Sequence, residues 1–98
     1  MLLRIDLQDG FEKDTVHLLM NGNLIGEYHE VQTDLRIGLA LSQEFHLPEG
    51  AYTLTLEVRN RGLSASIPIE LKNDTFLRVW IQNDSLAYEI GAEPYHYL

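Results

Sequence analysis

The chain has 98 residues, 45% of them hydrophobic, which is enough for one domain with a single core and too little for two. Fifteen acidic residues against seven Lys and Arg give a formal charge of -8, so the protein repels phosphate backbones and anionic lipids. We therefore expect neither a nucleic-acid partner nor a membrane role. The absence of cysteine excludes disulfides, thiolate metal sites and cysteine nucleophiles.

The N-terminal segment, MLLRIDLQDG, does not resemble a secretory signal, because Arg4 and Asp6 interrupt the apolar stretch that a signal needs. The longest apolar run in the chain, residues 37–41, is far too short to span a bilayer. We therefore expect a soluble, cytoplasmic protein with a single domain over residues 1–98.

Apolar residues alternate with polar ones along almost the whole chain, and no window carries a helical stripe, which predicts an all-β protein. The first strand contains Leu3, Ile5 and Leu7. Residues 14–30 have the pattern of a hairpin with a three-residue loop, Asn21-Gly22-Asn23, in which Asn23 takes the left-handed position. The register of this hairpin predicts three cross-strand pairs: Met20 with Leu24, Val16 with Tyr28, and His17 with Glu27.

The next segment, TDLRIGLAL at residues 33–41, allows two interpretations. Its leucines and isoleucine alternate at Leu35, Ile37, Leu39 and Leu41, which predicts an extended conformation. Thr33 or Asp34 could instead cap a short helix. We expect the extended form and leave the helix open.

Between residues 43 and 90, four turns separate five alternating runs. We place each turn so that apolar residues face apolar residues across a hairpin. The turns at residues 48–51, 61–62, 73–75 and 83–84 then predict four representative pairs: Phe45 with Leu54, Leu56 with Ile67, Leu71 with Leu77, and Val79 with Tyr88. The last of these turns, Asn83-Asp84, has residue types that tolerate a positive φ.

This register also predicts cross-strand partners for Arg78 and Trp80. Arg78 falls opposite Glu70 on one side and Glu89 on the other, which predicts a surface charge row and no anion site. Trp80 falls beside Pro68. Because proline cannot donate to a ladder, Pro68 belongs on an edge strand or at a bulge, so one connection should cross between two sheets.

About seven to nine short strands in a chain of 98 residues predict a two-sheet antiparallel β-sandwich of immunoglobulin-like or prealbumin-like type. After the last strand, Gly91 releases the chain and Pro94 keeps the tail at residues 91–98 extended. In an extended tail Tyr95 and Tyr97 face the same way. We expect this tail to pack on its own sandwich or on a sister subunit.

Residues with the capacity for chemistry are scattered. Three of the four histidines lie on separate predicted strands, at His17, His29 and His46, without metal-ligand spacing, so we expect no zinc or iron site. The loop DLQDGFEKD gives a weak calcium candidate, although its spacing is not that of an EF-hand. The carboxylates of this candidate are Asp6, Asp9, Glu12 and Asp14.

We find no nucleophile elbow, no glycine-rich phosphate loop and no zinc-protease motif, and therefore expect neither an enzyme nor a cofactor. The aromatic surface near the last strands and the tail is the better candidate for contacts with a ligand or a partner. The residues of this candidate surface are Phe76, Trp80, Tyr95, His96 and Tyr97.

One segment resembles a known family. LPEGAYTLTLEV, residues 47–58, is similar to the P-x-G-x-Y-x-L-x-V hairpin of carboxypeptidase regulatory-like and other prealbumin-like modules, which implies a sandwich fold. The enzymes with that fold, the hydroxyisourate hydrolases, end in Tyr-Arg-Gly-Ser, whereas this chain ends in Tyr95-His96-Tyr97-Leu98 and lacks the arginine. The order of DTVHLLMNGNLIGEY, TDLRIGLA, RGLSASIPIEL and EPYHYL is similar to that of small uncharacterised bacterial β-sandwich proteins.

The first functional hypothesis is a non-catalytic β-sandwich that acts through protein contacts, either with another protein or with itself as a homo-oligomer. The alternative is a module that binds a small ligand or a carbohydrate by stacking on Trp80, Tyr95 or Tyr97. A small hydrolase of prealbumin-like fold is a second alternative.

Overall fold

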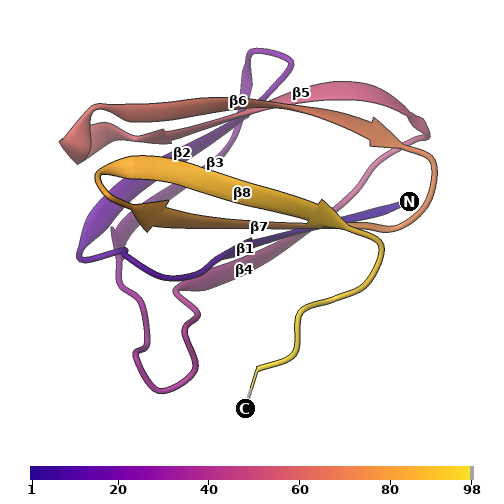
Figure 1. The fold of residues 1–98 in the computed structure, drawn as a ribbon. Coiled ribbons are helices and arrows are strands. Elements are labelled where there is room, and N and C mark those ends of the chain that lie inside the picture. Colours follow the sequence, from indigo (N-terminus) through magenta and orange to yellow (C-terminus); the bar gives the residue numbers. More distant parts are fainter. Residues whose placement is uncertain (98) are drawn as a thin grey trace.

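The computed structural model describes residues 1–97. Eight strands form two four-stranded sheets that pack face to face (Figure 1), which confirms the predicted all-β, two-sheet sandwich. A short 3-10 helix, η1 (Arg59–Arg61), joins two of the strands. The strands are β1 (Leu2–Leu7), β2 (Asp14–Met20), β3 (Asn23–Val31), β4 (Leu41–His46), β5 (Gly50–Val58), β6 (Leu63–Leu71), β7 (Thr75–Gln82) and β8 (Ser85–Gly91).

Sheet A has the strand order β4-β1-β7-β8, and sheet B has the order β3-β2-β5-β6. β1 lies inside sheet A, antiparallel to β4 and parallel to β7, while the other strand pairs are antiparallel. The chain therefore moves from one sheet to the other between β1 and β2, β3 and β4, β4 and β5, and β6 and β7. The predicted crossing between sheets occurs repeatedly, and Pro68 lies on the edge strand β6, as expected.

The alternating pattern of the sequence produces the core directly. On β1, residues Leu3, Ile5 and Leu7 are buried, and on β7 the buried residues are Leu77 and Val79. Successive side chains of a strand point to opposite faces, so one face of each sheet is apolar and the two apolar faces pack on each other. The opposite face of sheet A is left for polar and aromatic side chains.

Two predicted hairpins are wrong. Residues 43–47 do not pair with the strand that follows, because β4 pairs with β1 and β5 pairs with β2 and β6. Leu71 and Leu77 likewise lie in different sheets, since β6 belongs to sheet B and β7 to sheet A. The alternation of apolar and polar residues determines which face of a sheet a residue occupies. It does not determine which strand lies next to it, because several strands are equally apolar.

The two remaining hairpins agree with the prediction to different degrees. β7 and β8 pair as predicted, with Val79 opposite Tyr88. β5 and β6 keep the predicted faces, but the register is displaced by two residues, so Leu56 lies opposite Ala65 and not Ile67. The cause is η1, which lengthens the connection and ends at Gly62 with a left-handed φ of 67°.

The β2–β3 hairpin has a tighter turn than predicted. Val16 lies opposite Tyr28 and His17 opposite Glu27, as expected. At the end of the hairpin Asn21 and Gly22 both have a positive φ and form a two-residue turn, so Met20 lies opposite Asn23. An irregularity between Leu18 and Leu19 absorbs the difference.

Residues 33–40 form neither the extended segment nor the helix that the sequence allows for residues 33–41, and Leu41 already belongs to β4. They make a loop that projects from the sandwich (Figure 1) and is closed by a bridge between Asp34 and Leu39. Arg36 donates hydrogen bonds to the Asp34 side chain, and Leu35 is almost fully exposed. The alternation of apolar residues in this segment therefore does not correspond to a strand with one buried face.

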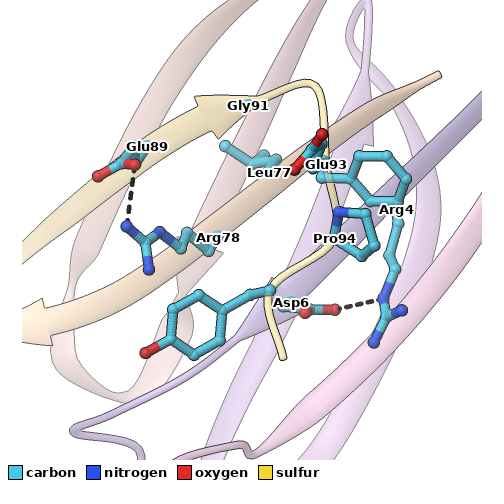
Figure 2. Close-up of a pocket in the computed structure, with 10 residues that line it drawn as sticks. Arg4, Asp6, Leu77, Arg78, Glu89, Gly91, Glu93 and Pro94 are labelled. Carbon is cyan, nitrogen blue, oxygen red and sulfur yellow. Dashed lines mark hydrogen bonds and ion pairs between the residues drawn. The ribbon is translucent and has the colours of Figure 1, made fainter. Parts of the chain in front are cut away.

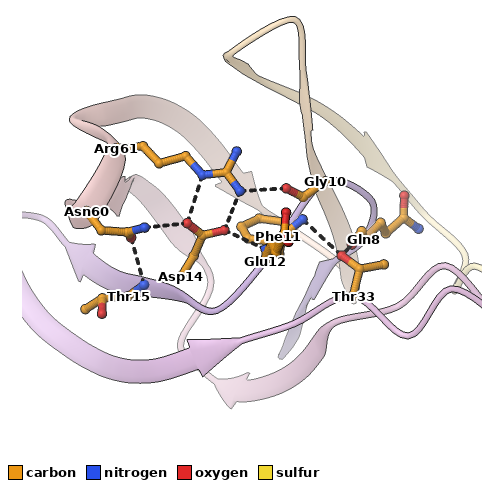
Figure 3. A network of polar contacts seen from close by, with 9 residues as sticks. All are labelled: Gln8, Gly10, Phe11, Glu12, Asp14, Thr15, Thr33, Asn60 and Arg61. Carbon is orange, nitrogen blue, oxygen red and sulfur yellow. Dashed lines mark hydrogen bonds and ion pairs between the residues drawn. The ribbon is translucent and has the colours of Figure 1, made fainter.

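A buried carboxylate joins two loops of the sandwich (Figure 3). Asp14, at the start of β2, is 0% exposed. Its oxygens accept hydrogen bonds from Arg61 Nε at 2.8 Å and Nη2 at 2.7 Å, from Asn60 Nδ2 at 2.7 Å and from the Glu12 amide at 2.8 Å. Arg61 also donates to the Gly10 carbonyl. Asp14 thereby ties the β1–β2 loop to the β5–β6 connection.

The same hydrogen bonds decide the ionisation of Asp14. Burial by itself raises the pKa of a carboxyl, but the hydrogen bonds from Arg61, Glu12 and Asn60, with the charge of Arg61, outweigh it and lower the pKa of Asp14. The carboxylate is therefore fully ionised at neutral pH and pairs with Arg61.

We predict that Arg61→Ala lowers the free energy of unfolding by about 3 kcal/mol, because it leaves a buried carboxylate without its cation. Urea unfolding at neutral pH measures this loss. Arg36→Ala is the matched control: Arg36 also pairs with an aspartate, Asp34, but on the exposed loop, so its removal should leave the urea midpoint nearly unchanged. Equal losses for both variants would contradict the structural role of Asp14.

We also predict that Asp14 contributes to acid sensitivity. Its pKa is lower in the folded state than the usual 3.8, so its contribution to stability is present above that pH and is lost as the pH falls through the folded-state pKa. Unfolding measured between pH 5 and about pH 2 should show a smaller decline for Asp14→Asn than for the wild type. Parallel pH profiles for the two proteins would contradict this assignment.

Candidate functional site

The outward side of sheet A carries the candidate site. We call this surface the outer face and define it by Arg4 and Asp6 of β1, and Phe76, Arg78 and Trp80 of β7. The register of the parallel pair places Arg4 beside Phe76 and Asp6 beside Arg78. After β8, the tail at residues 92–97 turns back over this face (Figures 1 and 2).

Asp6 is the polar centre of the outer face and is only 4% exposed. Its Oδ1 accepts hydrogen bonds from Arg4 Nε at 3.0 Å and from Ser42 Oγ at 2.6 Å. Its Oδ2 accepts a hydrogen bond of 2.8 Å from the Tyr97 hydroxyl. One oxygen is thus held by the sheet, and the other is presented to the tail.

Gln8, which directly follows β1, completes the contact with the tail. It is 8% exposed, and its Nε2 donates a hydrogen bond of 2.9 Å to the Tyr97 hydroxyl. The hydroxyl therefore lies between an acceptor and a donor, as only a group that both donates and accepts can. Burial, together with the neighbouring Asp6 carboxylate, raises the pKa of Tyr97 to about 12.

Arg78 is the second contact of the tail. Its guanidinium lies 4.7 Å from the ring centroid of Tyr95 and 5.9 Å from that of Trp80, and Nη2 lies 2.9 Å from Glu89. The predicted pair with Glu89 is confirmed, whereas the predicted pair with Glu70 is wrong, because Glu70 is on β6 in the other sheet.

Trp80 is not beside Pro68, for the same reason. β7 and β6 belong to different sheets, and Pro68 lies opposite Thr53 in sheet B. Trp80 pairs with Ala87 of β8, and its indole N–H donates to Gln82 at 3.1 Å. The Trp80 ring therefore remains part of the outer face.

A pocket of about 140 Å³ lies between the tail and the sheet (Figure 2). Its lining combines two guanidinium groups and three carboxylates with apolar rings. The charged residues are Arg4, Asp6, Arg78, Glu89 and Glu93, and the rings belong to Phe76, Pro94 and Tyr95. Tyr95 and Tyr97 contact each other edge to face at 5.1 Å.

The structure brings four of the five predicted contact residues to this face: Phe76, Trp80, Tyr95 and Tyr97. His96 is exposed on the tail, and Leu98 lies outside the described residues. The tail packs on its own sandwich, as expected. Sequence reasoning missed that Arg4, Asp6 and Gln8 form the polar floor, although their alternation with buried leucine and isoleucine already placed them on one face.

The acidic residues of the calcium candidate do not share a site. Asp6 lies on the outer face and pairs with Arg4. Asp14 lies at the far end of the β1–β2 loop and pairs with Arg61. Among residues 1–97, no group of three or more histidines or carboxylates is arranged to hold a metal ion. His29 pairs with Glu27 of the same strand at 2.9 Å.

A second feature lies along the edge of the sandwich. Tyr88 and Ile90 of β8 stand opposite Val79 and Leu77, on the side of sheet A that faces the core, yet they are 43% and 42% exposed, whereas Val79 and Leu77 are buried. A shallow groove between β8 and β6 is lined by Ile69 and Ile90, among other residues. We call this edge the open side.

Comparison of the chain with protein-family models, with curated proteins and with solved structures found no match. Within residues 1–97, no helix is long and apolar enough to cross a membrane.

We predict that Tyr97 ionises near pH 12, measured as phenolate absorbance during alkaline titration. Because the folded pKa lies above the usual 10.0, the contribution of this hydroxyl to stability is present below pH 10 and is lost as the pH rises toward 12. Tyr97→Phe should lack this ionisation step. A difference between the wild type and Tyr97→Phe whose midpoint lies at the ordinary pKa of 10.0 would contradict the contact with Asp6.

Proposed function

We propose that this protein is a non-catalytic β-sandwich that acts through protein contacts, and that a second copy of the chain covers its open side. β8 is an edge strand, and its outer backbone groups can pair with another strand. A two-fold arrangement would place β8 of one copy antiparallel to β8 of the other and extend sheet A across both copies.

The observation that carries this proposal is the exposure of core-facing side chains on β8. Tyr88 and Ile90 occupy inward positions but are only partly covered, since sheet B ends at β6 on this side. Removal of apolar area from water contributes roughly 25 cal/mol per Å², which favours the burial of these side chains against their counterparts in a partner. The large net charge of -8 opposes association, so added salt should strengthen it.

The charged groups under the tail are already paired with one another, which supports a non-catalytic role. Asp6 is bound by Arg4, Ser42 and Tyr97, and Arg78 is bound by Glu89, so these groups already have partners. The carbohydrate alternative has less support, because Arg78 lies over the rings of both Trp80 and Tyr95 that would stack on a sugar.

We also propose that the sandwich is of prealbumin-like and not immunoglobulin-like type. In the immunoglobulin constant domain the first strand pairs with the second, and the third pairs with the sixth. Here β1 pairs with β4 and β7, and β3 pairs with β2. This strand order differs from that of the immunoglobulin constant domain, and the resemblance carried by residues 47–58 then favours the prealbumin-like type.

We predict that Ile90→Asp weakens self-association at least tenfold, roughly 1.4 kcal/mol or more, because it places a charge in an apolar contact. Sedimentation equilibrium over a range of micromolar concentrations measures this change. Leu24→Asp is the matched control, since Leu24 is 53% exposed on the other edge, β3, and its substitution should leave the mass unchanged.

A wild-type protein that remains monomeric at all these concentrations would contradict the proposal. Dissociation by Leu24→Asp with no effect of Ile90→Asp would place the contact on β3 and would equally overturn it. Thermal unfolding of both variants shows whether the monomer is intact.

A further inference from the structure

We propose that the outer face recognises an extended peptide segment with two tyrosines separated by one intervening residue, and that the tail of this protein occupies the recognition site in cis. A partner of this chemistry must displace the tail to bind. The proposal concerns the outer face and does not depend on self-association at the open side.

The first part of the recognition site is selective for a hydroxyl. Asp6 and Gln8 are both more than nine-tenths buried, and they direct an acceptor and a donor at the same oxygen, that of Tyr97. Arg4 and Ser42 hold the other Asp6 oxygen, so the free oxygen has a fixed direction. A phenylalanine at this place would leave both buried groups without their partner, which favours tyrosine.

The second part of the site is selective for an aromatic ring. The Arg78 guanidinium lies 4.7 Å from the Tyr95 ring centroid and is held in place by Glu89. Such a contact between a cation and a ring is attractive, and any ring at this position can make it. Side chains two residues apart in an extended segment face the same way, which explains why Tyr95 and Tyr97 reach the two parts together.

The tail is attached in a way that permits exchange. Its residues up to His96 are exposed, and within residues 1–97 no backbone hydrogen bond joins the tail to a strand. Its anchors are the side-chain contacts of Tyr95 and Tyr97, and a pocket of about 140 Å³ remains beneath it. A covalently attached tail nevertheless has a high effective concentration, so a free peptide should bind the wild type only weakly.

The experiment uses the full-length chain with Tyr95→Ala and Tyr97→Ala, which keeps the tail but removes its anchors. The probe is a synthetic peptide with the sequence of residues 92–98, AEPYHYL, titrated by calorimetry and by the fluorescence of Trp80, the one tryptophan of the chain. We expect one peptide to bind per double-variant chain, and the wild type to bind it at least tenfold more weakly.

Two control peptides test the chemistry. A peptide with phenylalanine in place of the second tyrosine should bind at least tenfold more weakly, because it lacks the hydroxyl that Asp6 and Gln8 require. A peptide with alanine in place of histidine should bind like the original, since His96 is exposed. Equal binding of the phenylalanine peptide, or no binding of AEPYHYL by the folded double variant, would overturn the proposal.

If the double variant does not fold, full-length Tyr97→Phe gives the same test, because it deletes a single oxygen. Its tail should have lower backbone NMR order parameters than the wild-type tail, and it should bind AEPYHYL more tightly than the wild type does. His96→Ala is the control and should match the wild type in both measurements. Unchanged order parameters and affinity in Tyr97→Phe would overturn closure in cis.

Discussion

The parallel pairing of β1 with β7 is the constraint on which the rest of the structure depends. It aligns Ile5 with Leu77 on the inward side and Asp6 with Arg78 on the outward side. The same register therefore builds the centre of the core and the polar floor of the outer face. Because parallel neighbours cannot be joined by a tight turn, β1 and β7 need a long connection, and the chain forms β2 to β6 before β7 returns to lie beside β1.

Two buried aspartates show how similar groups take different roles. Asp14 receives its hydrogen bonds from Arg61, Asn60 and a nearby amide, all of which belong to the loops of the sandwich. Asp6 receives two from the sheet and one from a tail that is otherwise exposed. A buried carboxylate whose partners include an exchangeable segment is suited to recognition, whereas one enclosed by fixed partners is suited to stability.

The open side and the outer face are separate surfaces with different chemistry. The open side offers apolar side chains and unpaired backbone at β8, which suit a second strand. The outer face offers a directed hydrogen-bond pair and a cation, which suit a tyrosine-bearing segment. They lie close together, because the tail leaves the end of β8 at Gly91 and crosses to Arg78 and Asp6.

The amino-acid sequence by itself determined which side of each strand faces the core, because a period of two leaves no other way to bury leucine, isoleucine and valine. It also determined the β7–β8 hairpin, in which Asn83 and Asp84 both adopt the positive φ of a tight turn. Only the tertiary structure decided which strands are neighbours across the sheets. Asp6 and Arg78 are far apart in the chain, and no local pattern couples them. Both residues contact the tail only because the strand order places them side by side. The sequence does not determine that order, since many other strand pairings would bury the same apolar residues.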